Sequence, residues 1–354
     1  MFSKGQNILK EALMAGPSSL SGVHQNLAFQ DVLHGFLKTF SEDKKTLLIF
    51  ADEDSLDEFL IHCPFACLSL KSFGASPYSG LEPSSQISPS RIHFLHAALS
   101  ESHKVFATYT EALLFKTLSP AELSAQTKTF EFADAFFTDP TADLIQIGYT
   151  PSQFVEKPGQ FCDKGGILDV FSPAHAHPHR IELFGNDIES LRKFSTETQR
   201  TLEEVPNLTL VPAHECIYNK ENKPELLNFA SKVSQNDSWK KDLLHKIRNE
   251  IPFSEKEFFI PLFYKNSQSA LNYFDPKKTN IVEFDSNQIR ADWTLRQNNL
   301  NDEFESFDSD SIKYLKPSQL YAEHYDLSAF QRRTDVCSVS VSYTHLTLPT
   351  TPYV

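Results

Sequence analysis

Strand-length apolar runs alternate with helix-period segments over the first third of the chain, from about residue 22 to residue 118. The expected strands are 46–51, 66–70 and 105–108, and the expected covering helices are 27–36, 55–60 and 92–99. Alternation of this kind is typical of a parallel β-sheet with helices on its faces. We therefore predict an α/β fold whose first unit is a parallel-sheet domain, interrupted by a Pro- and Ser-rich loop at 74–89.

The pattern changes at about residue 126 to short, antiparallel-looking strands that continue to about residue 211. Gly165-Gly166 and Gly185-Asn186 supply the left-handed backbone that tight turns require. After Pro212 the chain becomes polar and helical, and a later strand at 280–284 suggests a return to the first layer. At 354 residues the chain is long enough for two or three domains.

One expected strand of the middle region, residues 180–184, has an apolar side and a side with charged and aromatic residues. Over residues 180–184, period-2 alternation sends Ile181 and Leu183 to one side and Arg180, Glu182 and Phe184 to the other. The apolar pair belongs in a core. An exposed aromatic ring beside an arginine is the composition that protein interfaces favour, so we predict a docking surface. The alternative is a Phe184 ring covered by another part of the chain.

Composition limits the function classes. The net charge of −13 has the wrong sign for a chain whose main task is to neutralise phosphates, which disfavours direct DNA or RNA binding. Five scattered cysteines fit a reducing cytoplasm. No run approaches the roughly 18 apolar residues that a membrane span needs, and no export signal is visible. We expect a soluble, cytoplasmic protein without a membrane partner.

Motifs for catalysis are missing. The segment where a phosphate-binding loop is expected, 20–27, has one glycine, Gly22, and lacks the lysine and following hydroxyl that a P-loop needs. No G-x-S-x-G elbow is present. His175, His177 and His179 have the spacing for a metal site on an extended chain, but flanking prolines favour a solvated histidine loop. We predict no catalytic residue, no cofactor and no metal.

The last residues, 338–354, alternate like a strand but contain no charged residue. The sequence of this segment, SVSVSYTHLTLPTTPYV, resembles a translated sequencing adapter appended to a truncated reading frame. We therefore expect the native sequence to depart from this chain near Asp335.

Four motifs carry a family resemblance: 155–161 (VEKPGQF), 165–171 (GGILDVF), 180–192 (RIELFGNDIESLR) and 197–204 (ETQRTLEE). They closely resemble the N-terminal module of bacterial transcription-repair coupling factors, which is similar to the excinuclease protein UvrB. The resemblance implies a degenerate RecA-like domain interrupted by a small α/β insertion that binds a second excinuclease protein, UvrA. The domains it implies are 1–125 and 213–335 for the two parts of the RecA-like domain, 126–212 for the insertion, and 336–354 for a non-native tail.

In this family an Arg or Lys before the glycine pair, an Arg opening the next strand and a Phe closing it contact UvrA. The matching positions are Lys164, Arg180 and Phe184, and we add Glu182 from the same face. The common residue at the first position is arginine. Lys164 keeps the charge but loses the planar, bidentate guanidinium.

The predicted function is a non-catalytic adaptor of transcription-coupled nucleotide excision repair that recruits UvrA to RNA polymerase stalled at DNA damage. In the family, double-stranded DNA, ATP and magnesium are handled by motor domains whose motifs are not in this segment. The alternative is an ATP-dependent DNA repair helicase or a UvrB-type excinuclease protein with its own nucleotide site. A third hypothesis is a scaffold with a metal-bound loop at His175.

Overall fold

The computed structural model describes residues 18–21, 44–63, 66–79, 87–100, 103–232, 237–251, 253, 255–306 and 315–337. The predicted helix at 27–36, the incomplete phosphate loop at Gly22 and the segment 338–354 lie outside these residues.

A six-stranded sheet forms the centre of the first unit, and every neighbouring pair of its strands is parallel. Its strands, in spatial order, are β1 (Ser18–Ser21), β16 (Arg332–Cys337), β15 (Thr279–Phe284), β2 (Lys45–Phe50), β4 (Val105–Tyr109) and β3 (Leu68–Leu70). The central strands are buried on both faces, since Leu47, Leu48 and Ile49 are all fully buried. This is why they read as continuous apolar runs rather than as alternating ones.

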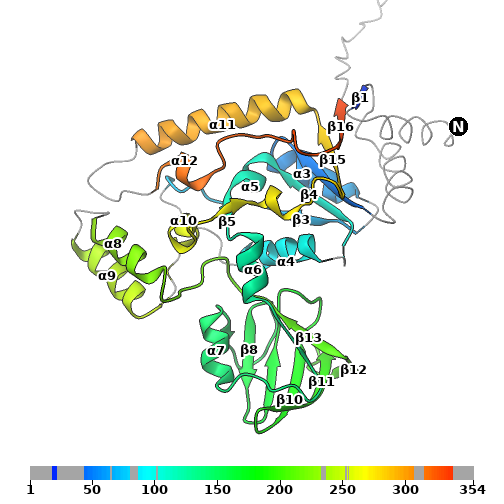
Figure 1. The fold of residues 1–354 in the computed structure, drawn as a ribbon, viewed down its shortest axis with the longest axis vertical. Coiled ribbons are helices and arrows are strands. Elements are labelled where there is room, and N and C mark those ends of the chain that lie inside the picture. The colour runs from blue at the N-terminus through cyan, green and yellow to red at the C-terminus, as the bar shows by residue number, and fades with distance from the viewer. Residues whose placement is uncertain are drawn as a thin grey trace, which may run out of the picture.

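Helices accompany this sheet as the periodicity predicts. Helices α3 (Glu53–His62) and α4 (Ile87–Leu99) contain the predicted segments 55–60 and 92–99. Helix α3 begins where the side chain of Asp52 accepts the Ser55 N–H at 2.8 Å. The long helix α11 (Ser286–Ser306) runs beside β15 and β16, and α4 lies beside β3 (Figure 1).

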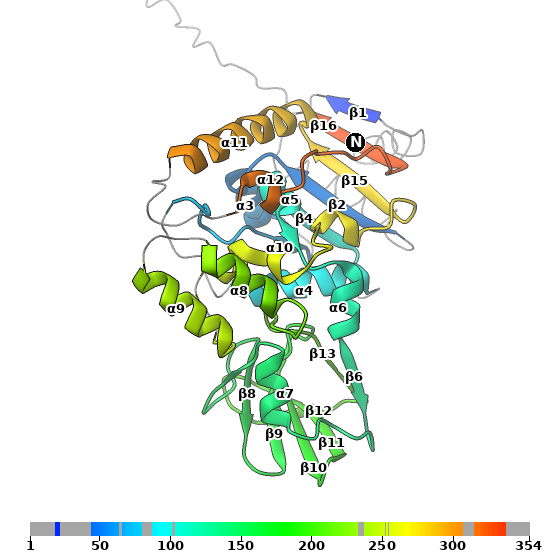
Figure 2. The same cartoon turned by 60° about the vertical axis from the view of Figure 1, so that its left-hand side comes forward.

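The second unit is an antiparallel-rich sheet. Its strands, in spatial order, are β12 (Thr201–Glu204), β11 (Asp187–Phe194), β10 (His179–Phe184), β9 (Ile167–Val170), β8 (Gln160–Asp163) and β7 (Thr150–Pro151). The β7–β8 pair is parallel and the others are antiparallel. Helix α7 (Pro140–Gln146) packs beside β7 and β8, and the unit extends away from the parallel sheet (Figure 2). Its buried residues form a core of their own.

The chain reaches this unit through β6 (Lys128–Glu131) and leaves it through β13 (Asn207–Leu210), which pair with each other. The predicted α/β class is therefore confirmed. The RecA-like assignment and the domain boundaries stay predictions. Among the described residues, no helix combines the length and apolar character that crossing a bilayer requires.

The remaining elements are short pieces and a helical pair. Helices α8 (Lys223–Lys232) and α9 (Asp237–Arg248) pack on each other in the region predicted to be polar and helical. The others are α5 (Thr110–Leu114), α6 (Pro120–Gln126), α10 (Ile260–Phe263), α12 (Pro317–Leu320), the 3-10 turns Lys256–Phe259 and Ala270–Tyr273, and the paired strands β5 (Lys116–Thr117) and β14 (Gln268–Ser269).

A buried ion pair joins the end of the second unit to the first. Arg91 of α4 donates from Nε to Glu215 Oε1 at 2.5 Å, and both side chains are almost completely buried. The Thr117 hydroxyl donates to the other oxygen of Glu215, and Arg91 Nη1 donates to the Lys71 carbonyl at 2.6 Å. Glu215 lies shortly after β13, so this contact fixes where the second unit returns to the first.

Candidate protein-docking surface

The strand β10 shows the alternation that the sequence predicts. Ile181 is fully buried in the core of the second unit, and Leu183 packs against that core. Arg180, Glu182 and Phe184 are partly buried or exposed residues of the strand. The predicted division of β10 into a core face and an outer face is confirmed.

Phe184 is 75% exposed, which makes it one of the most exposed large apolar side chains in the described part of the chain. It lies at the end of β10, opposite Asp187 of β11, where Gly185 turns the hairpin with φ of 62°. The alternative in which another part of the chain covers this ring is therefore wrong. An exposed ring at a hairpin tip is free to enter an apolar pocket on another molecule.

The outer face of the sheet carries a row of charged residues across four neighbouring strands. The backbone register places Asp169 of β9 opposite Arg180, Arg180 opposite Arg192 of β11, and Arg192 opposite Glu204 of β12. We call these four residues the charge row. The two arginines are adjacent like charges, which cross-strand pairing disfavours, but an acidic residue stands on each flank.

Asp169 is the buried member of the charge row, with only 1% of its side chain exposed. Arg180 donates to it through two parallel hydrogen bonds, Nε to Oδ1 at 2.6 Å and Nη2 to Oδ2 at 2.8 Å. These bonds raise the pKa of Arg180. Lys164 Nζ approaches Asp169 Oδ2 at 3.7 Å, so both predicted cations gather around one carboxylate.

Glu182 has partners within the chain. Its carboxylate accepts from Arg192 Nη1 at 2.9 Å and Nη2 at 3.3 Å, and from the Ser190 hydroxyl at 2.8 Å. The structure thus brings Lys164 and Arg180 together and gives Glu182 a separate arginine. Sequence reasoning missed Asp169 and Arg192 as members of this face. Both lie inside the quoted motifs, but only the strand register of the folded sheet places them beside Arg180.

The prediction of a solvated histidine loop is wrong for two of its three histidines. His179 is buried, and His175 is half-buried, with its Nε2 accepting the Thr209 N–H at 3.0 Å. Only His177 is exposed. Burial lowers the pKa of His175 to about 4 and that of His179 to about 3, so both rings are neutral near pH 7. Within the described residues, no cluster of three or more His, Cys, Asp or Glu could hold a metal ion.

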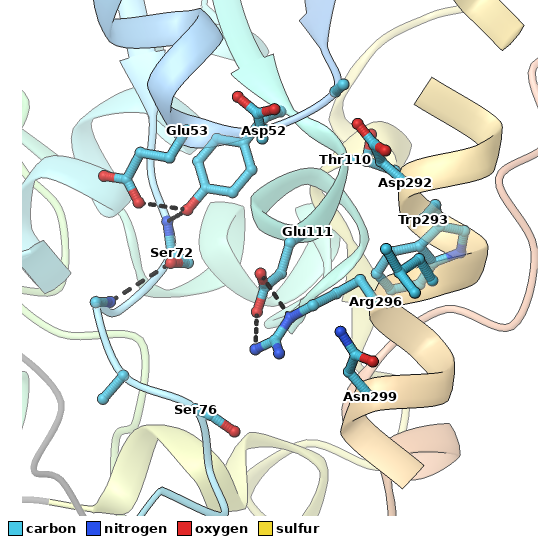
Figure 3. Close-up of a pocket in the computed structure, with 15 residues that line it drawn as sticks. Asp52, Glu53, Ser72, Ser76, Thr110, Glu111, Asp292, Trp293, Arg296 and Asn299 are labelled. Carbon is cyan, nitrogen blue, oxygen red and sulfur yellow. Dashed lines mark hydrogen bonds and ion pairs between the residues drawn. The ribbon is translucent and has the colours of Figure 1, made fainter. Parts of the chain in front are cut away.

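A second candidate region is a cavity of about 480 Å³ at the carboxyl edge of the parallel sheet, where β2 and β4 end (Figure 3). Ligands of open α/β sheets commonly bind at this edge. The acidic residues that line it are Asp52, Glu53, Glu111 and Asp292. Arg296 is its basic residue, and its Nε and Nη2 both donate to Glu111 at 3.0 Å. The one guanidinium among the lining residues is already engaged by Glu111, so it is not available to a phosphate.

Residues 137–216 match the family model of the UvrB interaction domain. The match contains the charge row together with Lys164, Glu182 and Phe184, so the outer face described above lies within the segment that is similar to this domain.

The chain is also similar to transcription-repair-coupling factors. It is 29% identical to that of Myxococcus xanthus over 201 residues, which are 55% of this chain and 17% of the relative. It is 26% identical to that of Haemophilus influenzae over 218 residues, or 61% and 19% of the two chains. With the Escherichia coli protein it shares 25% identity over 262 residues, or 71% and 22%. The resemblance predicted from the motifs is confirmed, and the match spans about a fifth of each relative's length.

Proposed function

We propose that this chain is an adaptor module of transcription-coupled nucleotide excision repair that recruits UvrA to RNA polymerase stalled at DNA damage. Lys164, Arg180, Glu182 and Phe184 form its docking surface. The observation that carries the proposal is the exposed Phe184 ring on the same strand as an ordered arginine, within the segment that matches the UvrB interaction domain. The similarity to transcription-repair-coupling factors supports the same role.

The chemistry of the surface fits a partner that presents an acidic group next to an apolar pocket. Arg180 is 22% exposed and Lys164 is 49% exposed at the side chain, so both cations reach solvent. Arginine and aromatic side chains dominate the binding energy of protein interfaces. Phe184 supplies the apolar anchor and the cations supply orientation.

The module acts without a nucleotide or metal of its own in this proposal. The sequence supports this, since the segment 20–27 lacks the lysine and the following hydroxyl of a P-loop. Addition of ATP and magnesium should leave the melting temperature of the chain unchanged. A rise with ATP concentration would instead favour the helicase or excinuclease alternative, because a ligand that binds only the folded state stabilises it.

The direct test measures the affinity of the chain for purified UvrA. The double substitution Arg180→Ala and Phe184→Ala should weaken binding by about 700-fold or more, because each anchor contributes roughly 2 kcal/mol or more. Equal retention of UvrA by the altered and unaltered chains would refute the proposal.

A matched control is available on helix α11. Arg290 is 51% exposed at the side chain with an acidic partner, Glu283, at 3.6 Å, and Leu295 is 59% exposed. Arg290→Ala with Leu295→Ala therefore removes one ion-paired arginine and one exposed apolar side chain outside the docking surface. This control should bind UvrA as the unaltered chain does.

A further inference from the structure

Asp169 is a buried carboxylate at the centre of the docking surface, yet it is too buried to touch a partner. Its neighbours along β9, Leu168 and Val170, face the core of the second unit, and Asp169 faces the other way. A buried charge is costly unless it is paired with good geometry. The bidentate contact from Arg180 supplies that pairing.

The same contact immobilises Arg180. Besides its two bonds to Asp169, the guanidinium donates from Nη1 to the Gln199 carbonyl at 3.5 Å. Its Cζ atom lies 4.9 Å from the centre of the Phe194 ring, which is fully buried. The contacts with Asp169, the Gln199 carbonyl and the Phe194 ring together fix the plane of the guanidinium. Of its five N–H groups, those not used in these bonds remain for a partner.

Lys164 is held less firmly, by the longer approach of its ammonium to the same carboxylate at 3.7 Å. The two predicted cations lie on different segments, and Asp169 is the group they share. Fixing a side chain before binding removes the entropy loss that docking would otherwise incur, about two- to tenfold in affinity for each immobilised long side chain.

From these contacts we infer that Asp169 is a positioning residue of the docking surface, which holds Arg180 and Lys164 in the arrangement that UvrA meets. The inference rests on the proposed function. Asp169 acts through the two cations and contacts no partner itself.

The test is a double-mutant cycle on the full chain, with affinity for purified UvrA as the readout. Asp169→Asn keeps the shape of the side chain and should weaken binding on the order of tenfold, the upper end of the ordering effect. In a chain that already carries Arg180→Ala, Asp169→Asn should change the affinity for UvrA by less than about threefold, because the arginine that Asp169 positions is absent. Glu204→Gln is the matched control, since this acid belongs to the charge row but is 81% exposed and contacts Arg192 instead.

A second variant covers the case in which Asp169→Asn does not fold, as judged by circular dichroism and melting temperature. Arg180→Lys leaves Asp169 and the positive charge in place but cannot form the bidentate contact. It should weaken UvrA binding on the order of tenfold.

The outcomes separate the two ideas. If the unaltered chain binds UvrA but Asp169→Asn binds equally well or more tightly, or if its effect adds fully to that of Arg180→Ala, the positioning role is refuted and the adaptor function stands. If Arg180→Lys binds like the unaltered chain, the ordered guanidinium has no role. If the unaltered chain does not bind UvrA, the adaptor function itself is refuted.

Discussion

Replacing Glu215 with alanine should destabilise the protein by about 3 to 5 kcal/mol, which is the usual result of removing one partner from a buried ion pair. Glu215 is fully buried and Arg91 is 1% exposed, so water cannot replace the lost carboxylate. The substitution leaves the Arg91 guanidinium with the Lys71 carbonyl at 2.6 Å as its remaining hydrogen-bond acceptor among the described residues.

The magnitude follows from the contacts that disappear. The charged hydrogen bond from Arg91 Nε accounts for about 1.5 to 3 kcal/mol, and the bond from the Thr117 hydroxyl for about 1 kcal/mol. The unpaired buried charge adds to this sum. Because Glu215 lies at the end of the segment that matches the UvrB interaction domain, the loosened region is the junction between the two units.

Urea denaturation followed by circular dichroism measures the effect as a shift of the unfolding midpoint. Glu215→Gln keeps the volume and an acceptor for Thr117, so it should lose less stability than Glu215→Ala. The double change Arg91→Met with Glu215→Leu removes both charges and should recover most of the loss. A free energy of unfolding for Glu215→Ala within about 1 kcal/mol of that of the unaltered protein would refute this reasoning. A double variant that is less stable than Glu215→Ala would also refute it.

Two further predictions concern the second unit. Gly185→Ala should cost about 1 to 2 kcal/mol of stability through backbone strain alone, because φ is 62° and an added Cβ would meet nothing within 4 Å. Gly185→Asn should cost less, since asparagine tolerates this conformation, and equal melting temperatures for the alanine variant and the unaltered chain would contradict the argument. Burial lowers the pKa of His179 to about 3, so the folded state keeps this ring neutral while the unfolded state is protonated below about pH 6.5. The contribution of His179 to stability should therefore be complete above pH 6.5 and fall by about 1.4 kcal/mol per pH unit below it, and His179→Gln should flatten this slope in urea titrations at pH 7 and pH 5.

The division of β10 into two faces was predictable from sequence because it depends on strand geometry alone. Successive side chains of a strand point to opposite sides, so Ile181 and Leu183 had to share the core face once residues 180–184 formed a strand. The parallel sheet was predictable for a similar reason, since continuous apolar runs such as 46–51 need cover on both faces.

The partners of the charged side chains required the tertiary structure. Asp169 and Arg180 are brought together by the register of β9 against β10, and nothing within either strand specifies which residue faces which across the gap. The histidine loop shows the same limit, because its prolines predicted exposure while the folded chain buries His179 and half-buries His175 against Thr209.

The sequence by itself determined the class of fold, the outward direction of Arg180, Glu182 and Phe184, and the family resemblance of this region, because these depend on local periodicity and on motifs read along the chain. Only the tertiary structure decided that Asp169 holds Arg180 while the Phe184 ring stays uncovered. Burial and cross-strand pairing depend on segments that are distant along the chain, and the folded arrangement alone sets their distances.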